Sequence, residues 1–452
     1  MDNNTHSVTL DKEKCKGCIN CIKKCPTEAI RVRNGKAIII SDRCIDCGEC
    51  IRICPNHAKK AVSDPLSILG DYKFNIVLPA PTLYSQFKKV TDVNIILTAL
   101  LEIGFDDLYE VSLAAQSISN YTHGAMSGAW ERLHGPIISS ACPAVVKLIS
   151  IRFPGLVDSV MNVIAPVELA AIAARKNIME KTGLAEHEIG VFFVSPCPAK
   201  ITAAKNPIGL DAPVIDGSFS MAEVYRAILP KFDKISKPKK LLSSGWRGVG
   251  WASSGGEAVS AGDDMVIAAD GIENVIKVLD EMENEKLQSI RFVELNACPG
   301  GCVGGCLTVE NTFVARSRLK RMCRLMEAES EGSVEKNVEE RYMNPDTLHW
   351  KRKLKYEPIL RIDADRAAAI RKMSDIERIF SELPDIDCGS CGAPSCRALA
   401  EDIVMGTAQE GDCVFKLREK MHTLFREMAE LQEYMPPPFR EAVNEESDRS
   451  EK

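Results

Sequence analysis

Eighteen cysteines are the residues of this 452-residue chain best suited to chemistry, and most of them fall in regularly spaced groups. Two runs near the amino terminus share the spacing C-x2-C-x2-C-x3-C-P. Three thiolates separated by two residues each can wrap one metal cluster in a tight loop, and the fourth can reach the cluster of the other run. The spacing therefore predicts two ligand sets: Cys15, Cys18, Cys21 and Cys54 in one, and Cys25, Cys44, Cys47 and Cys50 in the other.

This pair of runs resembles a bacterial ferredoxin with two [4Fe-4S] clusters, a module that relays single electrons. Pro26 and Pro55 follow the fourth cysteine of each run and hold it extended. Between the runs, Asn34-Gly35 predicts the turn of a short hairpin. Zinc is the alternative metal, but it would not need eight thiols in two matched runs. We expect a ferredoxin-like domain over residues 1–66.

A third group near the other end of the chain has the spacing C-x2-C-x4-C-x16-C. It resembles the small four-cysteine iron–sulfur domain of several redox proteins. A glycine-rich loop would supply three ligands, a helix over about Cys396–Thr407 would return, and the fourth ligand would follow it. A zinc knuckle is the alternative to the third [4Fe-4S] cluster that this pattern favours. The ligands would be Cys388, Cys391, Cys396 and Cys413.

In the middle of the chain, apolar β-like runs lead three times into Cys-Pro, at Cys142, Cys197 and Cys298. Cys302 follows closely in the sequence CPGGC. Helical stretches alternate with these runs, which predicts an α/β fold with largely parallel sheets. Ligands in such sheets bind at the carboxyl ends of the strands. We therefore expect the four thiols to meet in one ligand cage.

The segments SSACPAV, SPCPAK and ELNACPGGCVGGC resemble, in this order, the three signature motifs of the catalytic domain of [FeFe]-hydrogenases. The resemblance implies an H-cluster, in which one thiolate joins a four-iron cube to a di-iron unit that carries CO and cyanide. It implies that Cys142, Cys197 and Cys298 ligate the cube and that Cys302 is the bridge. Lys200 would donate to one cyanide. By the same resemblance, Ala80 and Pro81 would line the other cyanide, and Ser195 and Asn296 stand where relatives have methionines near the di-iron unit.

The chain departs from this family where protons are moved. Ala141 occupies the place of a second cysteine that shuttles protons, and a methyl group cannot do so. The acidic relay pair is replaced around Tyr121–Gly124, which leaves His123 or water at Ser140 as a detour. General acid–base delivery contributes roughly 10²–10⁴-fold in rate, so a slow enzyme is expected. These features resemble the divergent, sensory type of [FeFe]-hydrogenase that has a C-terminal cluster, here without a PAS domain.

The expected organisation is an α/β H-cluster domain of two lobes, flanked by an α+β ferredoxin module and a helical 4Fe-4S domain. Cys323 is expected to be an inert helical thiol, and Cys306 either a small buried residue or part of the cluster pocket. After the ferredoxin module, the expected segments are the H-cluster domain at 67–325, a helical connector at 326–380, the 4Fe-4S domain at 381–415, and a heptad helix with a disordered tail at 416–452.

Apolar residues recur at alternating steps of three and four from Val414 to Met435, where Pro436 ends the helix. Such an a/d seam predicts a short coiled coil, with a homodimer as one outcome. The alternative is a helix packed on its own domain.

The net charge of −6 argues against a nucleic-acid partner. Because the chain has no apolar run near 18 residues and no apolar amino-terminal core, we expect a cytoplasmic protein that does not span a membrane. The expected partners are H2 and protons, ferredoxin or another redox protein, hydrogenase maturation factors, and a signalling kinase or phosphatase. The alternative function is a hydrogenase-like iron–sulfur assembly or scaffold protein without H2 chemistry.

Overall fold

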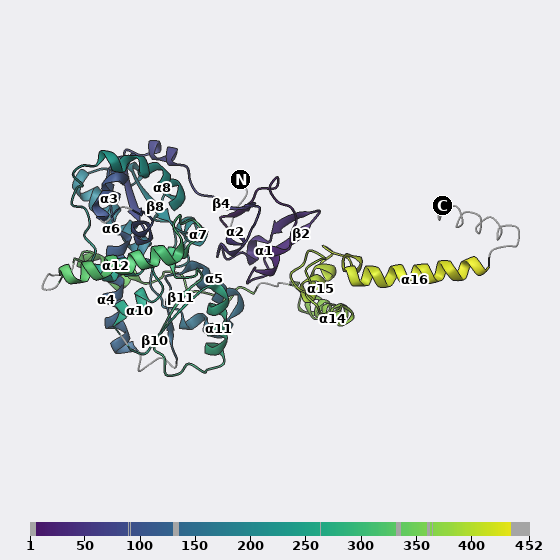
Figure 1. The fold of residues 1–452 in the computed structure, drawn as a ribbon. Helices are drawn as coiled ribbons and strands as arrows, with labels where there is room; N and C mark the ends of the chain where they lie inside the picture. Colours follow the sequence, from purple (N-terminus) through teal and green to yellow (C-terminus); the bar gives the residue numbers. More distant parts are fainter. Residues whose placement is uncertain are drawn as a thin grey trace.

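The computed structural model describes residues 6–88, 90, 92–129, 135–262, 264–330, 336–358, 362–363 and 365–434. Figure 1 shows an amino-terminal module in purple between a large central domain and a small C-terminal domain, from which one long helix extends. None of the helices within the described ranges is both long enough and apolar enough to cross a bilayer. Met435 and the tail 436–452, for which disorder was expected, lie outside the described residues.

The amino-terminal module is built from two antiparallel strand pairs. The strands β1 (Val8–Leu10) and β4 (Lys59–Ala61) form one pair, and β2 (Ile30–Arg33) and β3 (Lys36–Ile39) form the other. Asn34 and Gly35 connect β2 to β3 with φ angles of 52° and 70°, as a type I′ turn requires, so the predicted hairpin is confirmed. One-turn helices, α1 (Asn20–Lys23) and α2 (Glu49–Arg52), lie inside the two cysteine runs.

The first lobe of the central domain contains a four-stranded parallel sheet in the order β6-β5-β8-β9. Every residue of the inner strand β8 is buried, because helices cover both faces of such a sheet. The strands are β5 (Phe74–Pro79), β6 (Asp107–Leu108), β8 (Ile189–Ser195) and β9 (Gly217–Ser220). The helices of this part are α3 (Val93–Leu101), α4 (Val111–Ala129), α6 (Pro166–Thr182), α7 (Pro198–Lys205), α8 (Met221–Ile228) and α9 (Trp246–Gly250).

The second lobe has a three-stranded parallel sheet in the order β10-β11-β7. Two lobes with parallel sheets confirm the predicted fold class. The strands are β7 (Ile137–Ile138), β10 (Val266–Asp270) and β11 (Phe292–Asn296). Helices of this lobe are α5 (Pro143–Arg152), α10 (Gly256–Ala261) and α11 (Ile272–Glu283).

The segments after the second lobe divide differently from the expected boundaries. Helix α12 (Thr312–Ser330) continues across residue 325, and its Ala315 and Leu319 pack in the core of the first lobe. Further along, α14 (Arg366–Glu382) packs Ile376 and Ile379 into the same small core as α15 (Cys396–Val404). The C-terminal core thus includes α14, and the rest of the described connector contains a 3-10 helix at Glu340–Tyr342 and the one-turn helix α13 (Pro345–Leu348).

The C-terminal domain is attached to the amino-terminal module through the β2–β3 hairpin. The Val32 amide donates to the Gly392 carbonyl at 2.8 Å, which extends the hairpin edge. Asp402 of α15 accepts from Arg31 Nε at 2.7 Å and from Arg33 at 2.5 Å. The Arg31 and Asp402 side chains are only 5% and 12% exposed, so this ion pair lies in the contact between the two domains.

We expect Asp402→Asn to weaken this contact by about 3 kcal/mol, because removing one partner leaves the buried arginine charge uncompensated. Anaerobic thermal unfolding and limited proteolysis would show an earlier transition and release of the C-terminal domain. Asp375→Asn is the matched control, since Asp375 pairs with Arg378 at the surface, where both side chains are more than half exposed. Equal behaviour of the two variants would contradict this account.

Candidate functional site

The amino-terminal module brings its eight cysteines together in two groups. One small cavity is lined by Cys25, Cys44, Cys47 and Cys50. The other is lined by Cys15, Cys18, Cys21 and Cys54. Each group takes three thiols from one run and one thiol from the other, as the spacing predicts.

The four C-terminal cysteines also converge. Cys391, Cys396 and Cys413 belong to the core shared by α14 and α15. Burial raises the pKa of Cys391, and the neighbouring charges of Cys388 and Cys413 add to the rise. All four thiols therefore surround one place in this domain. The helix that was expected over Cys396–Thr407 is α15, which ends at Val404.

The central cysteines lie where strands give way to helices. Cys142 immediately precedes α5 and Cys197 immediately precedes α7, and each helix has proline as its first residue. Cys298 follows β11 by two residues, and Cys302 begins a short 3-10 helix, Cys302–Gly304. This arrangement places the thiols at the carboxyl ends of β8 and β11 and beside helix amino termini, where the partial positive charge favours a thiolate.

The electrostatics show that these four remote thiols share one site. Burial raises the pKa of Cys298 to about 12, and the charges of Cys142 and Cys302 contribute to the rise. Burial likewise raises the pKa of Cys197 well above its usual value, with Cys298 and Cys302 adding to it. Four half-buried thiols that repel one another as thiolates form a donor set suited to a cationic iron cluster.

Lys200, on the first turn of α7, points its ammonium group into this thiol site. Among the neighbouring charges, that of Cys302 acts on it most strongly. Burial opposes the positive charge of Lys200, but the thiolates of Cys302, Cys197 and Cys142 outweigh burial and raise its pKa above the usual value. Lys200 is thus a charged, half-buried donor beside the cysteine that the family resemblance implies to be the bridge.

Ala80 and Ser195 lie next to each other at the carboxyl ends of two neighbouring strands of the first sheet. Pro79 of β5 pairs with Val194 of β8, so the next residues of both strands are neighbours. The 3-10 helix that Pro81 begins (Pro81–Ser85) contacts the helix Cys302–Gly304. The structure therefore brings the Ala80-Pro81 segment to the Cys302 side of the site.

Ser195 and Asn296 use their polar groups within the protein. The buried Ser195 hydroxyl donates to the Cys197 carbonyl at 2.9 Å and fixes the loop that carries this thiol. Asn296 Nδ2 donates to Glu294 Oε1 at 2.7 Å. Both side chains thus hold neighbouring residues in place.

A narrow cavity adjoins Ala141, the position that lacks the proton-carrying thiol. Its lining includes Ser140, Ala141, Glu168 and Lys200. The Ser140 hydroxyl donates to the Val163 carbonyl at 2.8 Å. Burial raises the pKa of Glu168 to about 7, although the Ala165 amide donates to its carboxylate. Glu168 was not among the residues expected from the sequence.

A second buried carboxyl, Glu257 of α10, reaches Ala141 through one hydroxyl. Ser139 Oγ donates to Glu257 Oε2 at 2.6 Å and accepts from the Ala141 amide at 3.1 Å. The other carboxyl oxygen, Glu257 Oε1, has no hydrogen-bond partner among the described residues. Burial and the nearby charge of Glu294 raise the pKa of Glu257, which favours a protonated carboxyl. Sequence reasoning missed this group, because nothing in α10 resembles a motif.

Glu294 could have indicated this pair of carboxyls, because it is the one charged residue of strand β11. It is 3% exposed and accepts from the Gly255 and Ala258 amides at 3.0 and 2.9 Å. By contrast, the expected detour at His123 is not favoured, since this side chain is exposed on α4. Tyr121, in the same segment, bonds to His349 Nε2 at 2.7 Å.

The amino-terminal module meets the central site through Gly48, Arg52 and Cys306. Arg52 donates to Glu49 Oε2 at 2.7 Å and to the Gly304 carbonyl at 3.1 Å. Although burial opposes its charge, the thiolates of Cys298, Cys306 and Cys47 raise the pKa of Arg52. Gly48 lies so close to Cys306 that a Cβ atom on it would be 2.5 Å from the sulfur. Cys306 therefore lies between the Cys47 group and the central thiols.

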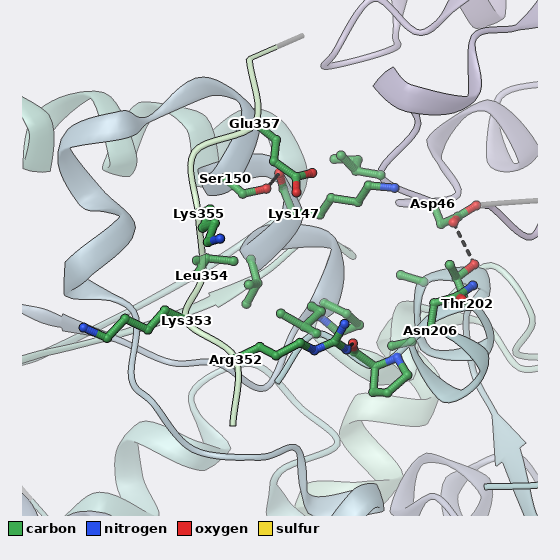
Figure 2. A pocket seen from close by; sticks show the side chains of 17 residues that line it. Asp46, Lys147, Ser150, Thr202, Asn206, Arg352, Lys353, Leu354, Lys355 and Glu357 are labelled. Carbon is green, nitrogen blue, oxygen red and sulfur yellow. Dashed lines mark hydrogen bonds between the residues drawn. The ribbon is translucent and has the colours of Figure 1, made fainter. Parts of the chain in front are cut away.

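A cavity much larger than the one beside Ala141 lies elsewhere, between the amino-terminal module, the central domain and the chain around Arg352 (Figure 2). It has a volume of about 560 Å³, and at one side Thr202 Oγ1 donates to Asp46 Oδ2 at 2.7 Å. Lys147 and Arg352 extend into it, and its described lining contains no cysteine. Cavity size alone would thus have pointed away from the thiol site.

The four groups of thiols on this fold define a redox protein with several iron–sulfur centres. The family of the iron-only hydrogenase large subunit, C-terminal domain, matches residues 73–262 and 221–306, which together span more than half of the chain. A 4Fe-4S dicluster domain matches residues 7–55, and an Fe-S cluster family matches residues 383–415. The chain belongs to the iron-only hydrogenase large-subunit family.

Among curated proteins, iron hydrogenase 1 of Clostridium pasteurianum is 23% identical over 376 residues, which cover 68% of this chain and 65% of that relative. The chain thus spans slightly less than two thirds of that relative's length. Ferredoxin-2 of Desulfomicrobium norvegicum is 46% identical over 33 residues, covering 7% of this chain and 56% of the ferredoxin.

Solved structures with similarity to this chain include HydA(deltaEFG), from work on [FeFe]-hydrogenase H-cluster assembly, with a TM-score of 0.46 and 14% identity. Another is a variant of apo HydA1 from Chlamydomonas reinhardtii, with a TM-score of 0.47 and 14% identity. Both matches cover 65% of this chain and 98% of the other.

We expect Gly48→Ala to lower the unfolding temperature more than an alanine at a positive φ does where it meets no neighbouring atom. Gly48 has a φ of +76°, so alanine there costs about 1–2 kcal/mol, and contact with Cys306 adds roughly 1–3 kcal/mol. Gly35→Ala is the matched control, because Gly35 has a φ of +70° but nothing lies within 4 Å of the Cβ atom that alanine would add. Adding Cys306→Gly should return Gly48→Ala to the level of this control; no such recovery would contradict the observed contact.

Proposed function

We propose that this protein binds an H-cluster at Cys142, Cys197, Cys298 and Cys302 and interconverts H2 with protons and electrons. One observation carries the proposal: four thiols from three remote segments of the chain meet at strand ends around the ammonium of Lys200. Membership of the iron-only hydrogenase family supports the same assignment.

The residues fit such a group. Four half-buried thiols offer the donor set for a cube and a bridge, and Lys200 supplies a charged donor beside Cys302. When bound, the H-cluster would supply the metal chemistry that splits or forms H2. The chain would hold the cube through Cys142, Cys197 and Cys298, with Cys302 as the bridging thiolate. Ala80 and Pro81 would shape the opposite wall.

Three [4Fe-4S] clusters, one in each of the other thiol groups, would carry electrons in sequence. At the outer end, Lys23 Nζ donates to the Asp387 carbonyl and, at 3.1 Å, to the Pro394 carbonyl, which joins the C-terminal domain to α1. At the inner end, Arg52 and Gly48 join the Cys47 group to the central site. A ferredoxin or a similar redox protein would exchange electrons with this series.

Protons would reach the central site by a route that differs from the thiol relay of relatives. Glu257 holds its proton in a buried place and bonds to Ser139, which contacts the amide of Ala141. Without a thiol at Ala141, the last transfer would lack a side-chain carrier. We therefore propose slow turnover, which suits a protein that senses H2 or redox state and reports to a kinase or phosphatase. Assembly of the di-iron unit would require hydrogenase maturation factors.

Infrared spectroscopy of the matured protein tests the proposal directly. We expect bands of iron-bound CO and cyanide that change under H2, together with H2-dependent reduction of a dye. Serine variants of Cys302 and Cys323 form a matched pair: the first should lose the bands, and the second, which lies on α12, should keep them. A protein loaded with [4Fe-4S] clusters that never shows these bands would instead be the iron–sulfur assembly or scaffold protein.

We expect Glu257→Gln to lower H2 turnover roughly 10- to 100-fold, because an amide cannot pass on a proton. The infrared bands of the resting protein should stay unchanged, since Glu257 would not ligate iron. Glu110→Gln is the control: Glu110 is equally buried, but it accepts from the Ser243 and Ser244 amides in the first lobe. Unchanged turnover in Glu257→Gln would exclude this proton route.

A further inference from the structure

Helix α16 (Val414–Glu433) carries a continuous apolar face that its own protein leaves exposed. Figure 1 shows this helix, in yellow, extending away from the C-terminal domain. The side chains of the expected a and d positions are between 45% exposed, at Val414, and 68% exposed, at Leu431. Phe425 beside them is 63% exposed. The alternative of a helix packed on its own domain is thus not what the described residues show.

We propose that α16 pairs with α16 of a second copy of this chain in antiparallel orientation. The pairing does not depend on the proposed H2 chemistry. Apolar a and d positions at alternating steps of three and four form the seam of such a pair. The stripe itself does not determine the orientation of the two helices, but the charges beside it do.

Charge is divided unevenly along α16. Its first part, residues 416–426, contains four lysines and arginines and a single glutamate, Glu419, for a net charge of +3. Its last part, residues 427–433, contains three glutamates and no basic residue, for a net charge of −3. An antiparallel pair places the basic half of each helix against the acidic half of the other. A parallel pair places like charges together.

One antiparallel register matches both the seam and the charges. It forms layers from Val414 with Leu431 of the partner subunit, Leu417 with Met428 of the partner subunit, and Met421 with Leu424 of the partner subunit. Each layer occurs twice. In this register Lys420, at a g position, lies beside Glu427 of the partner subunit, and two such ion pairs flank the seam.

The parallel arrangement offers no comparable ion pair. There, the g residues Lys420 and Glu427 would lie beside the e residues Phe425 and Gln432 of the partner subunit, respectively. Neither pair has opposite charges. The antiparallel register is therefore the one that the sequence of α16 favours, and it uses only residues that the structure describes.

The orientation can be tested by exchanging charges in the full-length, cluster-loaded protein. Sedimentation equilibrium should show a reversible dimer for the unmodified chain. Lys420→Glu should weaken dimerisation by about tenfold, since two ion pairs become two repulsions. Glu427→Lys should do the same, and the double variant should restore the original dissociation constant, because the pairs form again with reversed sign.

Two further variants make the result decisive. Arg426→Glu changes the charge by the same amount at the outer f position and should leave the dissociation constant unchanged. Leu424→Glu should abolish the dimer while preserving iron content, since the side chain is exposed in the single chain. A monomer at every concentration, a dimer that survives Leu424→Glu, or single charge variants without effect would each overturn the proposal.

Discussion

The junction at which a strand ends in Cys-Pro and a helix begins is the constraint on which the central site depends. Proline fixes the backbone of the first helical residue and removes an amide donor that the helix does not need there. The preceding cysteine is thereby held extended at the helix amino terminus, as Cys142 is before α5 and Cys197 before α7. The partial positive charge of those termini offsets part of the cost of gathering several thiolates in a buried place. The parallel sheets then bring such junctions from distant parts of the chain to one region of the domain.

The sequence was sufficient for those parts of the fold in which chemistry requires a fixed spacing. The two crossed sets of amino-terminal thiols, the hairpin at Asn34-Gly35 and the parallel lobes all follow from local patterns. What could not be predicted depends on contacts between remote segments. Glu257 has no neighbouring motif and acquires its place only when α10 packs next to Ser139. Similarly, α14 resembles a charged connector in sequence, and only packing shows that Ile376 and Ile379 complete the C-terminal core.

Two groups of charged or titratable side chains lie on two sides of the same thiol site. On the side of Ala141, a thiol is missing and two buried carboxyls, Glu168 and Glu257, lie close by. On the opposite approach, Cys306 and Arg52 occupy the contact with the amino-terminal module. A guanidinium charge between two thiol groups would favour added negative charge on either one. The thiol site therefore has carboxyl groups on the side of Ala141 and a guanidinium charge on the side of the amino-terminal module.

The placement of the amino-terminal module has a consequence for how the molecule can fail. The C-terminal domain touches this module through Asp402 and Lys23, and the module in turn touches the central domain through Arg52. These contacts place the thiol groups in one series, with the amino-terminal module between the C-terminal domain and the central domain. On the proposed electron route, damage to one exposed thiol such as Cys18 would therefore isolate the outermost group from the innermost one, even if both remained whole. Oxidation of a single sulfur would then separate these groups functionally without unfolding the protein.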